Sequence, residues 1–272
     1  MIEKNRQGIH FFEFREFSKN KDIRHFISSR VGGVSNPPFD GLNLGMHVGD
    51  HLPNVVKNRG LLARALDSDL DLFTFANQTH SANVSVVEEN HRGCGASELG
   101  TAIPDTDAMI TQAKNIWLCV QIADCVPLLL YDPARQVIAA VHAGWKGIVK
   151  QIVQATVKKM VTQFGSKPEK ILAGLGPANG PCCYEIGEEV KQQIVTLDEL
   201  NQGTISPGNK PGKYFFDQWK AVSMQLVDAG LDPNNIEHSE LCTQCLNKTF
   251  FSSRADRGTT GRFAACIMLV PV

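Results

Sequence analysis

Three side chains that can bind a metal or act as nucleophiles interrupt apolar or turn-like sequence in the middle of the chain. They are His80 in Asn-Gln-Thr-His-Ser, Cys125 in Ala-Asp-Cys-Val-Pro and His142 in Ala-Val-His-Ala-Gly. Two imidazoles and one thiolate form a three-ligand set for zinc that leaves a fourth position open, as catalytic zinc sites do. We therefore predict that these side chains converge on one metal ion.

Two other interpretations of the same residues fit the sequence. In an ordinary core, His142 is a hydrogen-bonded histidine, Cys125 a small buried side chain and His80 a loop residue. In a cysteine hydrolase, Cys125 is the nucleophile and His142 or His80 is its base, with no metal required. Asp124 and Asp107 are our candidate catalytic carboxylates for proton transfer, and Asp124 equally fits a group that orients Cys125.

The residues around His142 predict the end of a strand, a turn at Gly144 and the start of a helix. A helix N-terminus presents free N–H groups and a partial positive charge, which favour a neutral imidazole and attract an anion such as phosphate. Lys146 lies on the first turn and adds a positive charge. An ordinary strand-to-helix connection has the same pattern, so the junction is a candidate anion site.

The spacing of apolar residues predicts the elements that position these side chains. Near-continuous apolar runs, typical of strands in sheets covered on both faces, span residues 116–122, 126–131, 137–141 and 263–270. Three-and-four spacing predicts one helix between Gly144 and Gly165, a second over residues 53–66 and a third over residues 217–229. Because no regular βαβ repeat is present, we predict an α+β fold with mixed sheets in a single domain, residues 1–272.

Charge and composition favour a small-molecule partner. The 272 residues carry 27 Lys and Arg and 28 Asp and Glu, a formal net charge of −1, which gives no electrostatic footprint for nucleic acid or an anionic membrane. No apolar run is long enough to span a bilayer, and residues 1–17 lack the apolar stretch of a signal peptide. We expect a cytoplasmic protein whose eight cysteines are reduced or bind metal, with no protein partner implied.

Four cysteines fall in two short motifs, Pro181-Cys182-Cys183 and Cys242-Thr243-Gln244-Cys245. The second motif is a Cys-x-x-Cys pair, but no second pair follows at zinc-ribbon spacing and no thioredoxin-like pattern surrounds it. The first motif differs from the Pro-Cys-x-x-Cys of cytidine-type zinc deaminases. Spacing alone therefore assigns no site to either motif.

An ordered series of motifs extends from about Arg30 to the C-terminus. In chain order they are Ser29-Arg30-Val31-Gly32-Gly33-Val34-Ser35, Leu42-Asn43-Leu44-Gly45, Gly49-Asp50 with Asn58-Arg59, His80, Ala123-Asp124-Cys125, Ala140 to Trp145, Gly176-Pro177 through Glu185, Cys242-Thr243 and Thr260-Gly261-Arg262. Together they resemble the multi-copper polyphenol oxidoreductase (laccase-domain) family. Members of that family have also been described as purine nucleoside phosphorylases with adenosine deaminase activity.

The resemblance implies a compact domain of layered mixed sheets flanked by helices, in agreement with the apolar pattern. It also implies a metal held by His80, Cys125 and His142, which match the family's His, Cys and His. The chain departs from the family at residues 252–258, Ser-Ser-Arg-Ala-Asp-Arg-Gly, where the family usually has an aromatic-Arg-Arg-Asp segment before Thr-Gly-Arg. If this segment shapes the substrate pocket, the departure changes specificity and leaves the metal-binding residues untouched.

The activity implied by the resemblance is phosphorolysis of adenosine, inosine or methylthioadenosine to the free base and (methylthio)ribose 1-phosphate, with deamination of adenosine. The implied partners are a purine nucleoside and phosphate, and the expected cofactor is zinc, with copper as the alternative. Arg30, Asn43, Lys146 and Arg262 are the expected substrate-binding residues, because charged and amide donors suit phosphate and ribose oxygens.

Two further function classes remain as alternatives beside the cysteine hydrolase. Copper-dependent polyphenol oxidation is named by the family, but one three-ligand site does not store the four electrons that reduce O₂ to water. The eight histidines also include no His-x-His pair of the kind that multicopper oxidases use. A non-catalytic binding module is disfavoured by the buried character of the candidate ligands.

Overall fold

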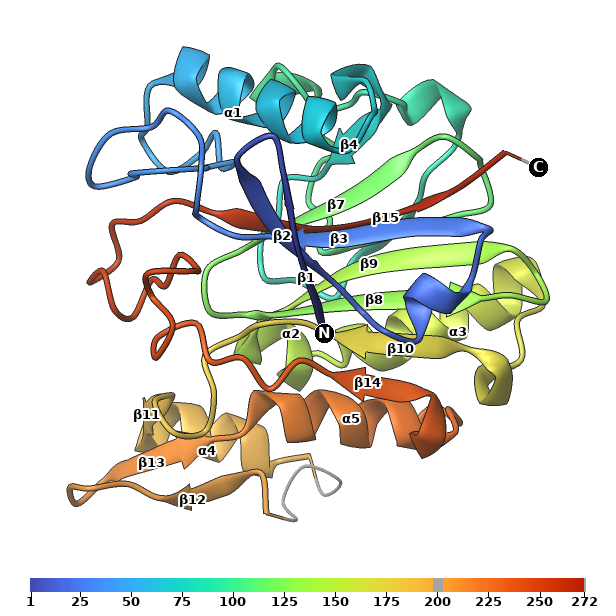
Figure 1. Cartoon of the computed structure of the whole chain (residues 1–272). Helices are drawn as coiled ribbons and strands as arrows, with labels where there is room; N and C mark the ends of the chain where they lie inside the picture. Colours follow the sequence, from blue (N-terminus) through green and yellow to red (C-terminus); the bar gives the residue numbers. More distant parts are fainter. Residues whose placement is uncertain (198–202, 272) are drawn as a thin grey trace.

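Two six-stranded mixed sheets dominate the fold of the computed structural model, which describes residues 1–197 and 203–271 (Figure 1). The first sheet contains, in spatial order, β1 (Ile2–Arg6), β2 (Ile9–Glu13), β3 (Ile23–Ser28), β15 (Phe263–Leu269), β7 (Trp117–Ile122) and β4 (Phe73–Phe75). The second contains β14 (Ile236–His238), β10 (Leu172–Leu175), β8 (Val126–Asp132), β9 (Val137–Ala143), β6 (Ala108–Thr111) and β5 (Val84–Val86). A small third sheet contains β11 (Glu185–Gly187), β13 (Lys213–Phe216) and β12 (Ile205–Pro207).

The main core lies between the two large sheets. Val120 and Ile267 of the first sheet belong to the same buried cluster as Leu129 and Ala140 of the second. Every residue of β7, β8, β9 and β15 is buried. Because these strands pack against the other sheet on one face and against helices on the other, both sets of alternating side chains are apolar.

Helices cover the outer faces of the two sheets, which gives a helix, sheet, sheet, helix order (Figure 1). α1 (Leu52–Ala65) packs on the first sheet, where Leu62 joins Phe26 and Trp117 in one cluster. α3 (Ile152–Phe164) and α5 (Gln218–Asp228) pack on the second sheet. α2 (Trp145–Val149) precedes α3, and α4 (Glu188–Val195) packs beside the third sheet.

The structure confirms the α+β prediction, and the predicted strands and helices agree with the observed ones to within two residues at nearly every end. The helix expected between Gly144 and Gly165 is wrong in one respect, because the chain forms two helices there. Gln151 adopts a left-handed conformation, with φ at 62°, and ends the first helix. Gln225 of α5 stabilises the break by donating a hydrogen bond of 2.8 Å to the carbonyl of Ile148.

No helix in the two described ranges combines the length and the apolar character needed to cross a bilayer.

The packing of Phe14 on Gly174 of β10 generates a stability prediction. A Cβ atom at Gly174 would lie 2.6 Å from two ring carbons of Phe14, whose side chain is fully buried. We expect Gly174→Ala to cost about 1–3 kcal/mol of folding free energy, because overpacking forces the ring or the strand to move. The measurement is the thermal unfolding midpoint, which should fall by several degrees.

Gly100→Ala is the matched control, since a Cβ atom there meets no atom within 4 Å. Its midpoint should stay close to that of the parent protein. Equal midpoints for the two variants would show that Phe14 adapts without cost.

Candidate active site

The side chains of His80, Cys125 and His142 lie together at one end of the stacked sheets. His80 is in the loop after β4, Cys125 is in the connection from β7 to β8, and His142 is on β9. The thiol sulfur and one ring nitrogen of each histidine all lie within 4.8 Å of one another. Cys125 Sγ is 3.9 Å from His80 Nε2, and the two imidazole rings meet edge to face with centroids 4.8 Å apart.

The geometry of this cluster fits a metal ion. Tetrahedral zinc with ordinary bond lengths holds a thiolate sulfur and an imidazole nitrogen about 3.6 Å apart, close to the observed separation. Gly144 leaves the necessary space, because a Cβ atom there would lie 2.8 Å from Cys125 Sγ and 3.0 Å from His80 Cδ2. Imidazole and thiolate ligands suit zinc and copper, so these three residues can hold either metal.

The buried carboxylate of Asp107 positions both histidines. Its Oδ1 accepts hydrogen bonds from His142 Nδ1 at 2.8 Å and from the backbone N–H of His80 at 3.1 Å. Its Oδ2 accepts from the backbone N–H groups of Thr79 at 3.1 Å and Ser81 at 2.7 Å. His80 has φ at 57°, and this left-handed conformation turns consecutive N–H groups toward the anion. The bond to Nδ1 leaves Nε2 of His142 available as a ligand atom.

Ionisation of the metal-free cluster is strongly coupled. Burial opposes ionisation of Cys125, but the neighbouring His142 and His80 rings lower its pKa to about 6. Burial also opposes protonation of His142, but the Cys125 thiolate and Asp107 raise its pKa to about 9. Burial opposes the charge on Asp107 as well, yet the hydrogen bonds from His142 and Ser81 hold its pKa far below its ordinary value. Near neutral pH, the metal-free site is therefore a thiolate beside an imidazolium.

Asp124 anchors the connection that carries Cys125. It has φ at 91°, and its carboxylate accepts hydrogen bonds from Thr243 Oγ1 at 2.6 Å and from the backbone N–H of Arg254 at 2.7 Å. Its carbonyl accepts from Gln218 Nε2 at 2.7 Å and from the backbone N–H of Asn179 at 2.8 Å. Asp124 therefore ties the Cys125 connection to the C-terminal segment.

The cluster opens into a cavity of about 510 Å³. That volume lies in the usual range for small-molecule sites. Four lining residues, Ser253, Arg254, Arg257 and Gly258, come from the segment that departs from the family pattern, so this segment does shape the pocket. The full lining is His47, Gln78, His80, Gln121, Ala123, Asp124, Cys125, His142, Trp145, Tyr184, Ser253, Arg254, Arg257, Gly258 and Arg262.

Of the four expected substrate-binding residues, only Arg262 lines this cavity. Asn43 is fully buried behind it and accepts the backbone N–H of Arg262 at 2.8 Å. The Arg30 guanidinium forms ion pairs with Asp40 and Asp256. Lys146 lies on α2 with its ammonium 5.6 Å from the centroid of the Trp145 ring.

Several lining residues were missed by sequence reasoning. Gln78 and Trp145 lie two and three residues from His80 and His142, so proximity in sequence was a usable signal. Gln121 lies on β7, four residues before Cys125, so the same signal applies to it. Tyr184 is distant in sequence from all three candidate ligands, but it falls in the motif from Gly176 to Glu185 that helped to carry the family resemblance. Gln78 is fixed by two hydrogen bonds to the backbone of Gln121, at 2.9 and 2.7 Å.

Comparison with known proteins identifies one family and several similar chains. The sequence profile of the family described as multi-copper polyphenol oxidoreductase laccase matches residues 24–270. The purine nucleoside phosphorylase YlmD of Bacillus subtilis is 38% identical over 248 residues, which cover 91% of this chain and 89% of YlmD. The adenosine deaminase RL5 of an unknown prokaryotic organism is 33% identical, over 91% of this chain and 94% of RL5. The crystal structure of YlmD from Geobacillus stearothermophilus superposes with a TM-score of 0.92 at 33% identity, covering 98% of each chain.

The hydrogen bonds to Asp107 predict its effect on metal binding. We expect Asp107→Asn to weaken zinc binding by about 10- to 100-fold, because an amide lacks the charge that the loop N–H groups and His142 stabilise. The measurement is a zinc titration against a competing chelator, with circular dichroism to confirm the fold. Asp105→Asn, an exposed carboxylate that accepts from Thr79 and Asn83 in the same loop, is the control. Equal zinc affinity in both variants would refute the positioning role of Asp107.

The coupled ionisation predicts the reactivity of Cys125 in the metal-free protein. Only the thiolate is alkylated, so the rate of modification by iodoacetamide should fall as the pH drops through about 6. His142→Asn should move this midpoint toward the ordinary cysteine value, and added zinc should protect Cys125. Peptide mass spectrometry measures the rate at this residue. A midpoint near the ordinary value in the parent protein would contradict the thiolate–imidazolium pair.

Proposed function

The chain belongs to the multi-copper polyphenol oxidoreductase laccase family, and from this membership we propose that it is a metal-dependent enzyme acting on purine nucleosides. The proposed reactions are phosphorolysis of adenosine, inosine or methylthioadenosine and deamination of adenosine. The names of the relatives YlmD and RL5 support these two reactions. The observation that carries the proposal is that all three candidate metal ligands line one cavity together with arginine and aromatic side chains.

We propose zinc as the metal, held by His80, Cys125 and His142. A bound zinc ion supplies Lewis acidity, and three protein ligands leave a position open for water or substrate. Asp107 holds His142 with Nε2 directed for binding, and Asp124 holds the Cys125 connection in place. Both carboxylates already accept several hydrogen bonds, so we assign them to positioning and not to proton transfer. Copper is the alternative metal, and a phenol oxidation assay of copper-loaded protein tests it.

Arginine side chains are the proposed phosphate-binding groups. Arg254, Arg257 and Arg262 all line the cavity, and guanidinium groups bind phosphate through paired N–H donors. Arg262 is held in place because its Nη1 donates to the carbonyls of Thr260 and Gly261, at 2.9 and 3.0 Å. The buried side-chain oxygen of Asn43 accepts a hydrogen bond from the backbone N–H of Arg262 and so helps to fix the position of Arg262. We therefore assign Arg262 to direct contact and Asn43 to support.

Arg30 and Lys146 lie outside the cavity lining and are proposed to act at longer range. The Arg30 guanidinium is bound to Asp256, which also accepts the Thr260 hydroxyl at 2.6 Å, so Arg30 braces the segment that carries Arg257. Lys146 adds positive charge beside Trp145 at the edge of the cavity.

Aromatic and amide groups in the lining suit a purine base. Trp145 and Tyr184 offer ring faces for stacking. Gln121 Oε1 is buried and has no hydrogen-bond partner among the described residues. A buried acceptor without a donor is costly, so this oxygen is well placed to accept from the exocyclic amine of adenine.

A cysteine hydrolase is the second candidate, and the lowered pKa of Cys125 beside His142 is the observation that favours it. In that case, Cys125 is the nucleophile and activity survives removal of metal. Activity assays with and without a chelator separate the two candidates.

The products formed from nucleosides test the proposed function. With phosphate present, zinc-loaded protein should convert inosine and methylthioadenosine to the free base and (methylthio)ribose 1-phosphate. Adenosine should also yield inosine without phosphate, since deamination needs only water. Mass spectrometry identifies each product. Release of free base with ribose, at a rate independent of phosphate, would make the enzyme a hydrolase instead.

Two variants refine this test. Arg262→Gln should raise the phosphate KM by about 10-fold or more, since a lost hydrogen bond to a charged group costs about 1.5–3 kcal/mol. Its deamination of adenosine should change little. Cys125→Ser should lose both reactions together with the bound zinc, while Cys94→Ser, a partly buried free thiol outside the cavity lining, should keep both.

A further inference from the structure

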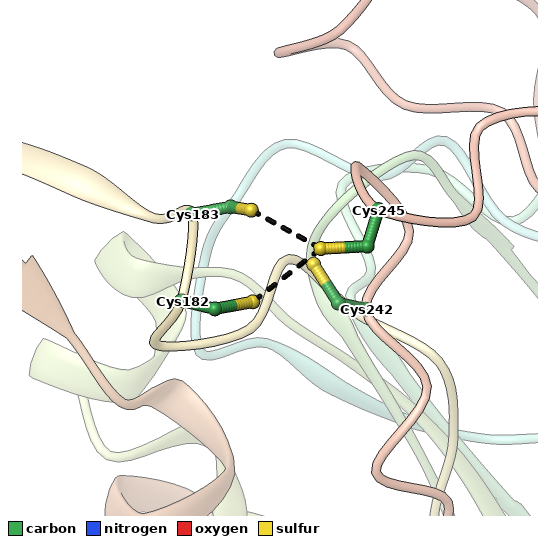
Figure 2. Close-up of side chains that lie close together, drawn as sticks. All are labelled: Cys182, Cys183, Cys242 and Cys245. Atoms are coloured by element: carbon green, nitrogen blue, oxygen red, sulfur yellow. Dashed lines mark hydrogen bonds between the residues drawn. The ribbon is translucent and has the colours of Figure 1, made fainter.

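Four cysteine side chains from two distant segments converge outside the cavity described above. Cys182 and Cys183 precede β11, and Cys242 and Cys245 follow β14, yet all four sulfur atoms lie within 4.8 Å of one another (Figure 2). Cys245 Sγ is 3.6 Å from Cys182 Sγ and 3.4 Å from Cys183 Sγ. Figure 2 shows the four sulfur atoms directed toward a common centre.

We propose that these four cysteines form a second, structural zinc site, which we call the tetrathiolate site. Tetrahedral zinc with four thiolate ligands places neighbouring sulfur atoms about 3.8 Å apart, which the measured separations approach. A disulfide requires about 2.05 Å, far shorter than either separation. Four protein ligands fill the coordination sphere, so this zinc has no open position for substrate and serves the fold.

The backbone around the cysteines favours this arrangement before metal binds. Gly180 accepts the N–H groups of both Cys183 and Tyr184 at 2.9 Å, which makes the tight turn that presents the two adjacent thiols. The N–H of Gly180 donates to Cys242 Sγ at 3.3 Å, a contact that stabilises a thiolate. The N–H of Thr243 donates to Ala178 at 2.9 Å and joins the two segments.

Gly180 also allows the two segments to approach closely. A Cβ atom there would lie 2.9 Å from the Trp219 ring and 3.3 Å from Cys242 Cβ.

The cysteine pattern differs from a zinc ribbon, in which both ligand pairs are Cys-x-x-Cys, because here one pair consists of adjacent residues in a turn. This is why sequence spacing alone assigned no site to either motif.

Metal binding at the tetrathiolate site exchanges protons for zinc and involves no oxidation. Each thiol that binds loses its proton to solvent, and one Zn²⁺ takes the place of the protons lost. The thiols are accessible for loading, since Cys182 and Cys245 are exposed and Cys183 is partly buried.

The position of the tetrathiolate site connects it to the cavity. Tyr184, which lines the cavity, directly follows Cys183, and Thr243, which donates to Asp124, directly follows Cys242. A zinc ion at the four thiolates therefore joins the segment that carries Tyr184 of the cavity lining to the segment whose Thr243 holds Asp124 of the lining. It would not enter the reaction itself.

Metal counting by mass spectrometry tests the proposal on the full chain, purified without an affinity tag and supplied with zinc. The parent protein should hold two zinc ions per chain. Cys242→Ser with Cys245→Ser should hold one, at the His80–Cys125–His142 cluster, while Cys94→Ser should hold two. Thermal unfolding should shift to lower temperature in the double variant. Equal zinc counts in the parent protein and the double variant, or no zinc in the parent protein, would overturn the proposal.

A second measurement does not depend on the folding of that double variant. Cys125→Ser should lose the cluster zinc and retain the other, so its zinc X-ray absorption spectrum should show only sulfur neighbours, at about 2.3 Å. Nitrogen neighbours, absence of zinc, or a disulfide among the four cysteines in freshly reduced and zinc-supplied protein would each overturn the proposal. None of these results depends on nucleoside turnover, so the tetrathiolate site and the proposed function can fail separately.

Discussion

The candidate active site depends on one buried carboxylate. Asp107 accepts hydrogen bonds from the His142 ring and from three consecutive N–H groups of the loop that carries His80. A buried charge is costly unless its oxygen atoms are satisfied, so the loop and β9 cannot separate without leaving that charge unpaired. The same bonds stabilise the left-handed conformation of His80. The position of both imidazoles therefore follows from the hydrogen bonds that a buried carboxylate requires, although this carboxylate is not one of the three candidate metal ligands.

Stacking of the two sheets places the third candidate ligand, Cys125. β7 belongs to the first sheet and β8 to the second, so the connection between them must pass from one layer to the other within three residues. Cys125 is the last of these residues, and Asp124 takes an uncommon positive φ to make the crossing. Continuous apolar strands on both sides fix the ends of this connection. The position of the Cys125 thiol is therefore fixed by the two buried strands on either side of it, although the residue itself lies in a connection.

The sequence was most informative where burial decides the structure. The runs that form β7, β8, β9 and β15 are largely apolar on both faces. Few structures other than a strand buried on both sides fit such a short apolar run. The break at Gln151 could not be predicted, because it depends on Gln225 from a helix far along the chain. Metal-binding residue types were recognisable in isolation, and the structure brings all three together. The place of Gln121 and Tyr184 in the cavity lining could not be predicted from their residue types, since the lining forms only when separate segments of the chain pack together.

The attachment of the C-terminal segment to Asp124 has a consequence for how the enzyme can change over evolution. Arg254 is held through its backbone N–H, which every amino acid except proline provides. The side chains of Ser253 and Arg257, which line the cavity, can therefore be exchanged while Asp124 still holds the segment beside the candidate metal site. Substrate preference can drift, or be redesigned in a focused library, without selection having to rebuild the catalytic centre at each step. The unusual residues of this chain in that segment are the kind of variation that such an attachment permits.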